Sequence, residues 1–248
     1  MNIDWSHEES YRGLNPLAAF HRNRLIFILN QFNNLDLKHG GHLADFGCSN
    51  GYILSLLQRG RFSGLGWQFS GFDYLDSLLE QARKKNLPDT TIAHFDLNSK
   101  PLEGNNQYDI VCCFETLEHT GDYMKGLRNL VNACKPGGYL IVSVPNEVGL
   151  PGLIKYLGRK AMRRNAYRNF FLGKSEGAYF WALCTGAPIE RFRVPPASGW
   201  GPHLGFDYRE MESFIDQQYL KSGLLKTIRW EHTMLNFNRV YIFKRPSA

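Results

Sequence analysis

Short apolar runs alternate with amphipathic segments along most of the chain. Five apolar runs predict strands, at residues 42–46, 67–73, 91–96, 108–115 and 139–145. Three segments with apolar residues at helical spacing predict helices, at residues 52–60, 75–86 and 124–135, the last stopped by a Pro-Gly-Gly sequence at 136–138. This alternation is typical of a mostly parallel sheet covered by helices, and the unbroken apolar run at 108–115 suits a central strand.

Other segments flank or interrupt this alternation. Residues 15–34 predict a leading helix that covers a cleft or a sheet edge, with Asn15 as its cap and Pro16 at its first position. Residues 147–206 break the pattern with a basic amphipathic stretch and a Gly/Pro-rich region, and we interpret them as an insertion. The closing part predicts a helix and two strands, at residues 207–223, 224–233 and 237–245.

Composition sets the class of protein. The chain has 248 residues, of which 43% are hydrophobic, enough to bury the core of one α/β domain. It has no run of eighteen uncharged apolar residues, and its first residues are polar and acidic, so we expect a cytoplasmic protein. The cysteines form no CxxC pair and predict reduced core residues without a zinc site; they are Cys48, Cys112, Cys113, Cys134 and Cys184.

The positive charge is concentrated in the insertion. Residues 147–174 contain seven basic residues and one acid, Glu147, so this stretch carries +6, the formal net charge of the whole chain. Because the remainder is balanced, the charge does not indicate general nucleic-acid binding. The stretch also lacks an RNA-binding motif, which argues further against a nucleic-acid partner.

Within this insertion, residues 150–172 combine apolar residues at helical spacing with basic flanks. The apolar positions are Leu153, Ile154, Leu157, Ala161 and Met162, and the basic positions are Lys155, Arg159, Lys160, Arg163 and Arg164. Such a helix can lie on an anionic membrane or bind an acidic substrate. The alternative is a lid helix that packs its apolar side on the domain and leaves its charges in water.

Candidate binding residues follow the predicted strands, where open parallel sheets bind their ligands. Residues 45–51 fit the pattern D-x-G-x-x-x-G, in which Gly47 and Gly51 permit a tight turn onto a helix whose free N–H groups suit a carboxylate. An ordinary strand-to-helix turn has the same pattern. Asp73, at the end of the second strand, can accept hydrogen bonds from both ribose hydroxyls, as the equivalent acid does in nicotinamide-dependent enzymes.

The glycine pattern argues against a nicotinamide site. A nicotinamide site would place glycine where Ser49 stands, to admit a pyrophosphate. Asp96 and Leu97, after the third strand, can receive an adenine, although a strand-end aspartate is also typical of a turn or a helix cap.

The ordered motifs LADFGCSNGYIL, SGFDYLDSLLEQAR, FDL, YDIVCCFETLEH and ACKPGGYLIVSVPN, within residues 43–146, resemble class I S-adenosylmethionine-dependent methyltransferases. The Leu117-Glu118-His119 sequence is similar to that of ubiquinone-biosynthesis O-methyltransferases and related bacterial enzymes. The resemblance implies a doubly wound Rossmann-like sheet of seven strands, mostly parallel with an antiparallel last strand. One domain would then comprise a helical cap (1–40), a cofactor-binding core (41–146), a substrate-side insertion after strand five (147–206) and a closing part (207–248).

The resemblance also implies roles for individual residues. Asp45 and Gly47 would position the methionine end of the cofactor, Gly51 would let the helix approach, and Asp73 would hold the ribose. Asp96 and Leu97 would bind adenine. The remaining predicted cofactor-binding residues are Cys48, Tyr74, and, flanking the sulfonium at the fourth strand, Phe114 and Glu115.

The predicted reaction is in-line methyl transfer, accelerated mainly by alignment and exclusion of water. A hydroxyl acceptor must lose its proton, and histidine suits that task, so His119 and His203 are candidate bases, with His21 as a third. His119 can instead hold its loop, and His21 can be an ordinary helix residue. Glu115, Glu118 and His119 could form a divalent site, but no other ligand is assignable and we predict no metal.

We therefore predict an S-adenosylmethionine-dependent methyltransferase that acts on a small-molecule, lipid-linked or glycan hydroxyl. Residues 150–172 are predicted to contact an anionic membrane peripherally. The alternatives are a protein that binds the cofactor without catalysis, for regulation or scaffolding, and a nicotinamide-dependent oxidoreductase of the same fold.

Overall fold

The computed structural model describes residues 8, 11, 16–99, 101, 102, 104, 106–161, 174–194, 201, 203–233 and 236–247. The expected helix cap Asn15 and the basic residues Arg163, Arg164 and Arg168 lie outside this set. The element boundaries below refer to the described residues.

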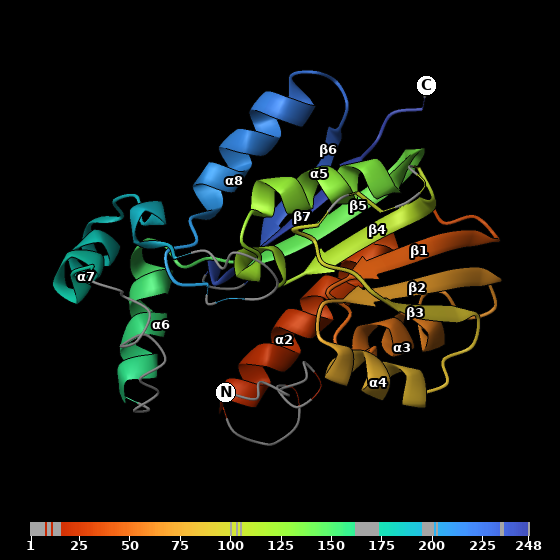
Figure 1. Cartoon of the computed structure of the whole chain (residues 1–248), viewed down its shortest axis with the longest axis horizontal. Coiled ribbons are helices and arrows are strands. Elements are labelled where there is room, and N and C mark those ends of the chain that lie inside the picture. The colour runs from red at the N-terminus through yellow and green to blue at the C-terminus, as the bar shows by residue number, and fades with distance from the viewer. Residues whose placement is uncertain are drawn as a thin grey trace.

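A seven-stranded sheet forms the centre of the molecule (Figure 1). Its strands are β1 (Gly41–Phe46), β2 (Trp67–Asp73), β3 (Thr90–His94), β4 (Tyr108–Phe114), β5 (Cys134–Pro145), β6 (Lys226–His232) and β7 (Asn238–Lys244). The order is β3-β2-β1-β4-β5-β7-β6, and β7 runs antiparallel to both of its neighbours while the other pairs are parallel. The predicted mostly parallel sheet with an antiparallel last strand is confirmed, and its order reverses between β1 and β4.

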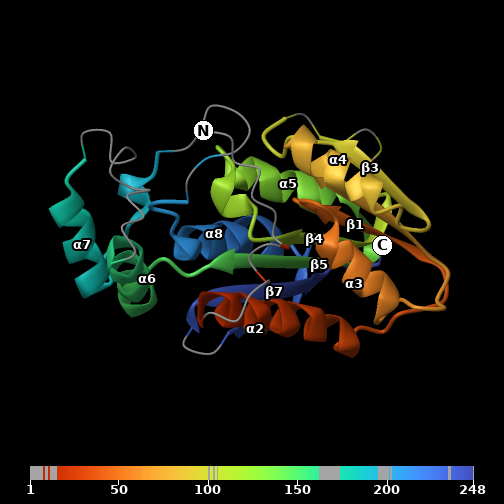
Figure 2. The same ribbon diagram turned by 90° about the horizontal axis from the view of Figure 1, so that it is seen from below.

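Helices cover both faces of the sheet, because adjacent strand residues point to opposite sides and both sides are apolar (Figures 1 and 2). On β1, Leu43 belongs to one buried cluster and Ala44 to the other. The first cluster takes residues from α2 (Pro16–Gln31), α3 (Tyr52–Arg59) and α4 (Asp76–Lys84). The second takes residues from α5 (Tyr123–Ala133) and α8 (Tyr208–Ile215), which a π-helical turn, η4 (Asp216–Leu220), extends.

The insertion forms a small apolar cluster of its own. Helix α6 (Gly149–Ala161) follows β5 and packs against α7 (Glu176–Thr185), with the short helix η3 (Glu190–Phe192) beside them. Both views show α6 and α7 side by side at one end of the molecule (Figures 1 and 2). In the described part of the chain, no helix is long and apolar enough to cross a membrane.

The boundary between α5 and β5 differs from its prediction. The sequence predicts a helix to residue 135 with Pro136-Gly137-Gly138 as its stop, but α5 ends at Ala133 and β5 already begins at Cys134. The reason is pairing: Cys134 lies opposite Tyr108 of β4, and the Gly137 and Gly138 backbones exchange hydrogen bonds with Arg245. Long-range strand pairing therefore overrides the local helix-stop signal.

The leading helix depends on its aromatic end for attachment to the sheet. Phe32, in the 3-10 turn η1 (Phe32–Asn34), is fully buried against the rings of Phe62 and Phe114. Replacement Phe32→Ala should reduce the free energy of unfolding by about 3–5 kcal/mol, measured by urea denaturation. Ile26→Ala on the exposed side of α2, where the side chain is 55% exposed, should change it by less than about 0.5 kcal/mol.

Candidate functional site

The loop between β1 and α3 is held in a left-handed conformation at three positions. Gly47, Ser49 and Gly51 have φ angles of 89°, 51° and 73°. A side chain at Gly47 would collide with Thr116 of the loop after β4, so the close approach that this glycine permits is between two loops of the protein. A side chain at Gly51 would crowd Ala82 of α4, which explains how the start of α3 lies close to its neighbour.

Two carboxylates lie at the ends of the neighbouring strands β1 and β2, Asp45 buried and Asp73 partly buried. Asp45 is 1% exposed, and its Oδ1 atom has no hydrogen-bond partner. Burial, and then the nearby charge of Asp73, raises the pKa of Asp45 to about 7. Because buried polar atoms are almost always hydrogen-bonded, the orphaned Asp45 oxygen fits a ligand that brings a donor or a positive charge to this edge.

Asp73 is tied to the same loop. Its Oδ2 accepts a hydrogen bond from the Ser49 backbone N–H at 2.8 Å, and its Oδ1 accepts one from the Leu75 N–H at 3.0 Å. Burial raises its pKa, and these backbone hydrogen bonds oppose the rise. Asp73 therefore joins the two strand ends, a contact that the sequence spacing did not reveal.

The third predicted carboxylate, Asp96, lies after β3, the next strand along the same edge. Its Oδ1 accepts hydrogen bonds from the backbone and side-chain nitrogens of Asn98, at 2.8 and 3.0 Å, so it stabilises a turn. Leu97 is buried, and its carbonyl accepts a hydrogen bond from Asn129. The structure thus aligns Asp45, Asp73 and Asp96 along one edge and gives Asp96 a turn contact as well.

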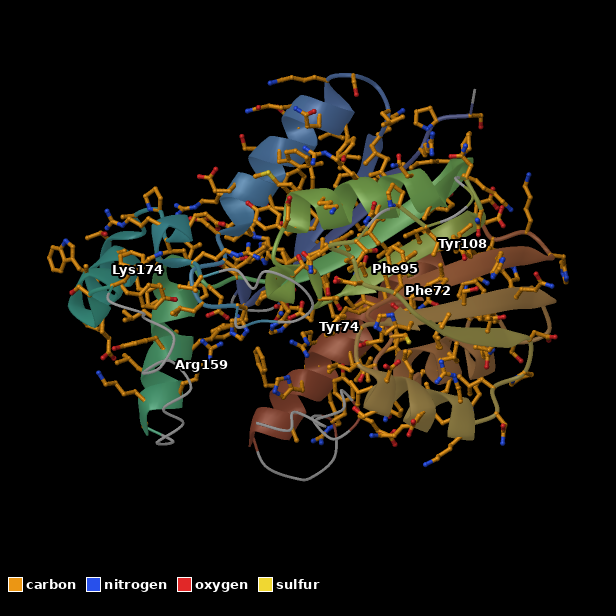
Figure 3. All side chains as sticks on the ribbon, in the orientation of Figure 1. Phe72, Tyr74, Phe95, Tyr108, Arg159 and Lys174 are labelled. Carbon is orange, nitrogen blue, oxygen red and sulfur yellow. The ribbon has the colours of Figure 1, made fainter. Side chains whose placement is uncertain are left out.

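The other predicted cofactor-binding residues divide by exposure. Tyr74 is 40% exposed, just beyond β2 and beside the ring of His94 (Figure 3). Cys48 is buried, and burial raises the pKa of its thiol well above the ordinary value. Phe114 is also buried, with its ring in the core beneath α2. Of these three side chains, only that of Tyr74 is open to solvent.

Glu115 is bound by three separate elements. Its carboxylate accepts hydrogen bonds from Arg24 of α2 at 2.8 Å, from Asn238 of β7 at 2.8 Å and from Ser143 of β5 at 3.0 Å. Sequence reasoning missed Arg24 and Asn238 because only the fold brings them to the end of β4. No cluster of three His, Cys, Asp or Glu side chains that could hold a metal ion occurs among the described residues.

The two candidate catalytic histidines lie together, with ring centres 5.2 Å apart. His119 ends the 3-10 turn η2 (Leu117–His119), and its Nδ1 lies 2.7 Å from the Gly201 carbonyl. Because a carbonyl only accepts, Nδ1 carries the proton and Nε2 carries the lone pair. Burial lowers the pKa of His119 to about 4, so the ring is neutral near neutral pH. His21 lies in α2 beside Phe20.

His203 is arranged differently. Its Nε2 lies 3.0 Å from Nη2 of Arg159, and a guanidinium only donates, so the Nε2 lone pair is already used. Burial lowers the pKa of His203 well below its ordinary value. His203 therefore connects His119 to the insertion through Arg159.

The loop that carries His119 has two further buried polar residues. Glu118 is 2% exposed, with an Oε2 atom that lacks a hydrogen-bond partner, and burial followed by the nearby Glu115 raises its pKa well above the ordinary value. Arg193 from the insertion donates to the Thr120 carbonyl at 2.7 Å and lies over the Tyr123 ring. Arg193, which sequence reasoning also missed, thus holds the end of this loop.

Glu147 anchors the basic helix to the domain. This carboxylate is 2% exposed and receives Lys155 at 3.1 Å and both terminal nitrogens of Arg159 at 3.0 Å (Figure 3 labels Arg159 on α6). Burial raises its pKa, but the adjacent cations outweigh burial and hold the pKa well below the ordinary value. Two of the basic residues expected on the flanks of the helix therefore point inward.

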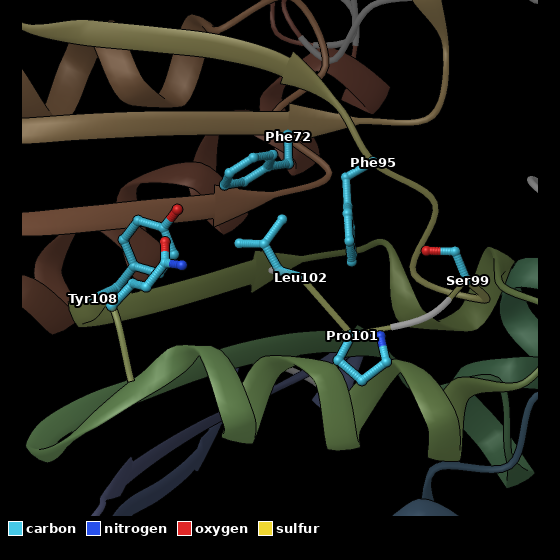
Figure 4. Close-up of a pocket in the computed structure, with 7 residues that line it drawn as sticks. Phe72, Phe95, Ser99, Pro101, Leu102 and Tyr108 are labelled. Atoms are coloured by element: carbon cyan, nitrogen blue, oxygen red, sulfur yellow. The ribbon is translucent and has the colours of Figure 1, made fainter. Parts of the chain in front are cut away.

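An open pocket of about 600 Å³ lies elsewhere, lined by Phe72, Phe95, Leu102 and Tyr108 among others (Figure 4). Phe72 precedes Asp73 on β2, and successive strand residues point to opposite faces, so this pocket opens on the face away from the Asp73 carboxylate.

The fold and the candidate site together define a class. A sheet that reverses order between β1 and β4, with carboxylates at the ends of β1 and β2, is the arrangement expected of class I S-adenosylmethionine-dependent methyltransferases. Residues 19–176 match the family model described as a methyltransferase domain. The chain therefore belongs to the methyltransferase domain family.

Individual relatives agree with this assignment. The chain is 29% identical over 149 residues to the ubiquinone biosynthesis O-methyltransferase of Rickettsia akari, covering 58% of this chain and 56% of that protein. It is 28% identical over 152 residues to the Vibrio cholerae protein of the same name, covering 58% and 55%. The chain thus spans a little over half the length of these relatives.

The shared fold extends over nearly the whole chain in solved structures. Magnesium protoporphyrin IX methyltransferase from Synechocystis PCC 6803, solved with bound SAH, superposes with a TM-score of 0.59 at 16% identity over 96% of this chain and 92% of that one. A SAM-dependent methyltransferase from Aquifex aeolicus gives 0.55 at 15% identity over 89% of each chain. At this identity the likeness establishes the Rossmann-like fold.

The Glu147 ion pairs should dominate the stability of the insertion. Glu147→Gln removes the buried carboxylate that compensates two partly buried cations and should cost about 3–5 kcal/mol in urea unfolding. Because the folded pKa lies below the ordinary 4.5, the native carboxylate contributes its stability above pH 4.5 and loses it as pH falls below that value. The variant should therefore show a shallower loss of stability in acid than the native protein.

Glu176→Gln is the matched control, since the Glu176–Lys160 pair lies in the same hairpin but is 44% and 61% exposed. It should cost less than about 1 kcal/mol. Equal losses of unfolding free energy in the two variants would show that the buried Glu147 pairs stabilise the protein no more than an exposed pair.

Proposed function

We propose that this protein transfers the methyl group of S-adenosylmethionine to a hydroxyl oxygen of a small-molecule, lipid-linked or glycan acceptor. The observation that carries the proposal is the buried, unpartnered Asp45 oxygen beside Asp73, at the end of the sheet where its order reverses. An orphaned buried carboxylate oxygen is costly without a ligand. A cofactor with a ribose and cationic groups supplies the missing partners.

Different residues of the chain would bind different parts of the cofactor. Asp45 would receive donors from the methionine end of the cofactor, Asp73 would accept the ribose hydroxyls, and the segment at Asp96 and Leu97 would meet the adenine. When bound, the cofactor supplies a methyl group already activated on a sulfonium. What the protein must add is alignment and the exclusion of water, which can contribute on the order of 7–11 kcal/mol.

On the acceptor side, His119 is proposed as the base. Its Nδ1–H is held by the Gly201 carbonyl, so its orientation and tautomer are set, and Nε2 can take the proton of an acceptor hydroxyl. A low pKa keeps the ring unprotonated and ready over the physiological range, although it also makes the ring a weak base. His203 and Arg193 then act as positioning residues from the insertion.

Oxygen is favoured over nitrogen by two considerations. The relatives with the printed name ubiquinone biosynthesis O-methyltransferase support an oxygen acceptor. A hydroxyl also needs the proton acceptor that this loop offers, whereas a neutral amine does not need one before attack. Among hydroxyl acceptors we place lipid-linked or prenylated phenols first and glycan hydroxyls second.

The ribose assignment can be tested by calorimetry with S-adenosylmethionine. Asp73→Ala should weaken binding by on the order of 2 kcal/mol, because hydrogen bonds to a charged carboxylate are lost. Glu80→Ala, on the exposed side of α4, should leave the affinity unchanged. Unfolding of each variant is measured in parallel, since Asp73 also binds the Ser49 N–H. An unchanged affinity in a folded Asp73 variant would remove the ribose assignment.

The base assignment is tested by release of adenosylhomocysteine across a panel of phenol and glycan acceptors. His119→Gln should lower kcat by roughly 10²–10⁴-fold with little change in cofactor affinity. The native rate should hold as pH falls toward the His119 pKa of about 4 and decline below it, because protonation removes the base. Tight cofactor binding without any product from the native protein would identify a binding protein instead of an enzyme.

A further inference from the structure

The hairpin of α6 and α7 exposes an unusual amount of apolar surface. Five of the ten large apolar side chains that are exposed in the described part of the chain belong to it. They are Leu150, Ile154 and Leu157 of α6, at 67%, 47% and 48% exposure, and Phe180 and Trp181 of α7, at 38% and 68%.

The two helices expose this surface for different reasons. On α6, Leu150, Ile154 and Leu157 recur at helical spacing and form one outer stripe, while Gly152 and Tyr156 face the domain. Helix α7 has no charged residue from 177 to 185, so its outer side is as uncharged as its buried side. A helix that is apolar all round is ordinarily enclosed, yet both views place α7 at the outer end of the molecule (Figures 1 and 2).

Charge indicates what covers this surface. The one acid among residues 147–174, Glu147, is buried and neutralised by Lys155 and Arg159. Lys160 is 61% exposed at the end of α6, where it pairs with Glu176, and the sequence that connects α6 to α7 adds three arginines. Apolar side chains beside an excess of cations are complementary to an anionic lipid surface, with an exposed tryptophan suited to the headgroup region.

We propose that the α6–α7 hairpin, through the outer residues named above, binds the surface of a membrane that contains anionic lipids. A second copy of the chain fits less well, because a symmetric contact would place two strongly basic segments against each other. A soluble acidic substrate would use the cations but would leave the uncharged outer side of α7 uncovered. The surface lies outside the candidate cofactor site, so membrane binding does not depend on the reaction proposed above.

The test is flotation of the purified full chain with vesicles of phosphatidylcholine alone or mixed with phosphatidylglycerol. The native protein should float with the mixed vesicles and not with phosphatidylcholine, and added salt should weaken the binding. Trp181→Ser and Ile154→Ser should each reduce partitioning by roughly tenfold, since each removes one buried side chain from the lipid contact. The thermal unfolding of each variant confirms that it is folded.

Matched controls lie on another part of the surface. Ile228→Ser alters a side chain of equal exposure, 48% against 47% for Ile154, on the edge strand β6 and should leave partitioning unchanged. Reversal of Arg163 and Arg164 to Glu should abolish flotation, whereas reversal of Lys221 and Lys226, which changes the net charge equally, should not.

Three results would overturn the proposal. The first is the absence of flotation of the native protein with mixed vesicles, and the second is an equal loss of flotation in the Ile154 and Ile228 variants. The third is a native dimer in light scattering that Trp181→Ser converts to a monomer, which would assign the surface to a second copy. Cofactor affinity is measured on the same samples, so that a failure of this proposal and a failure of the methyltransferase function remain distinguishable.

Discussion

The arrangement of the site depends on two carboxylates that lie where neighbouring parallel strands end, Asp45 buried and Asp73 partly buried. Strand order places Asp45 and Asp73 on neighbouring strands, with Asp73 two residues beyond the Gly71 that pairs with Asp45, and the Ser49 N–H joins Asp73 to the loop that follows β1. Protein contacts satisfy Asp73 but leave one oxygen of Asp45 without a partner. The cost of a buried oxygen without a hydrogen bond persists in a folded protein where a ligand can relieve it. This edge of the sheet therefore fits a ligand that brings a hydrogen-bond donor to Asp45.

The buried carboxylate of Glu147 organises the surroundings of the candidate base. Glu147 lies two residues after β5 and pairs with Lys155 and Arg159 of α6. Arg159 in turn contacts His203 beside His119. The insertion is therefore attached to the candidate base by a chain of charged and polar contacts. Because such contacts are strong only when buried, movement of α6 away from the domain would disturb the surroundings of His119. Helix α6 thus contacts the surroundings of the candidate base through Arg159 and also carries part of the exposed apolar surface of the α6–α7 hairpin.

Much of the fold was predictable because the local sequence signals agree with the tertiary structure. The apolar run at 108–115 occupies the centre of the sheet, and the glycines at 47 and 51 adopt the left-handed turn that their spacing suggests. The predicted end of α5 was wrong by two residues, because Cys134 pairs with Tyr108 of β4, a contact that the local sequence does not reveal. The candidate carboxylates could be named because strand ends are visible in the apolar pattern.

The sequence by itself determined the sheet class, the candidate ligand-binding edge and the acids at that edge, because these follow from local periodicity and from the rule that parallel strands end together. The tertiary structure decided which polar groups are satisfied. It alone brings Arg24 and Asn238 to Glu115, turns Lys155 and Arg159 inward to Glu147, and leaves Trp181 outside. Spacing along a chain specifies which face a residue occupies, whereas burial and pairing are set by residues remote in sequence.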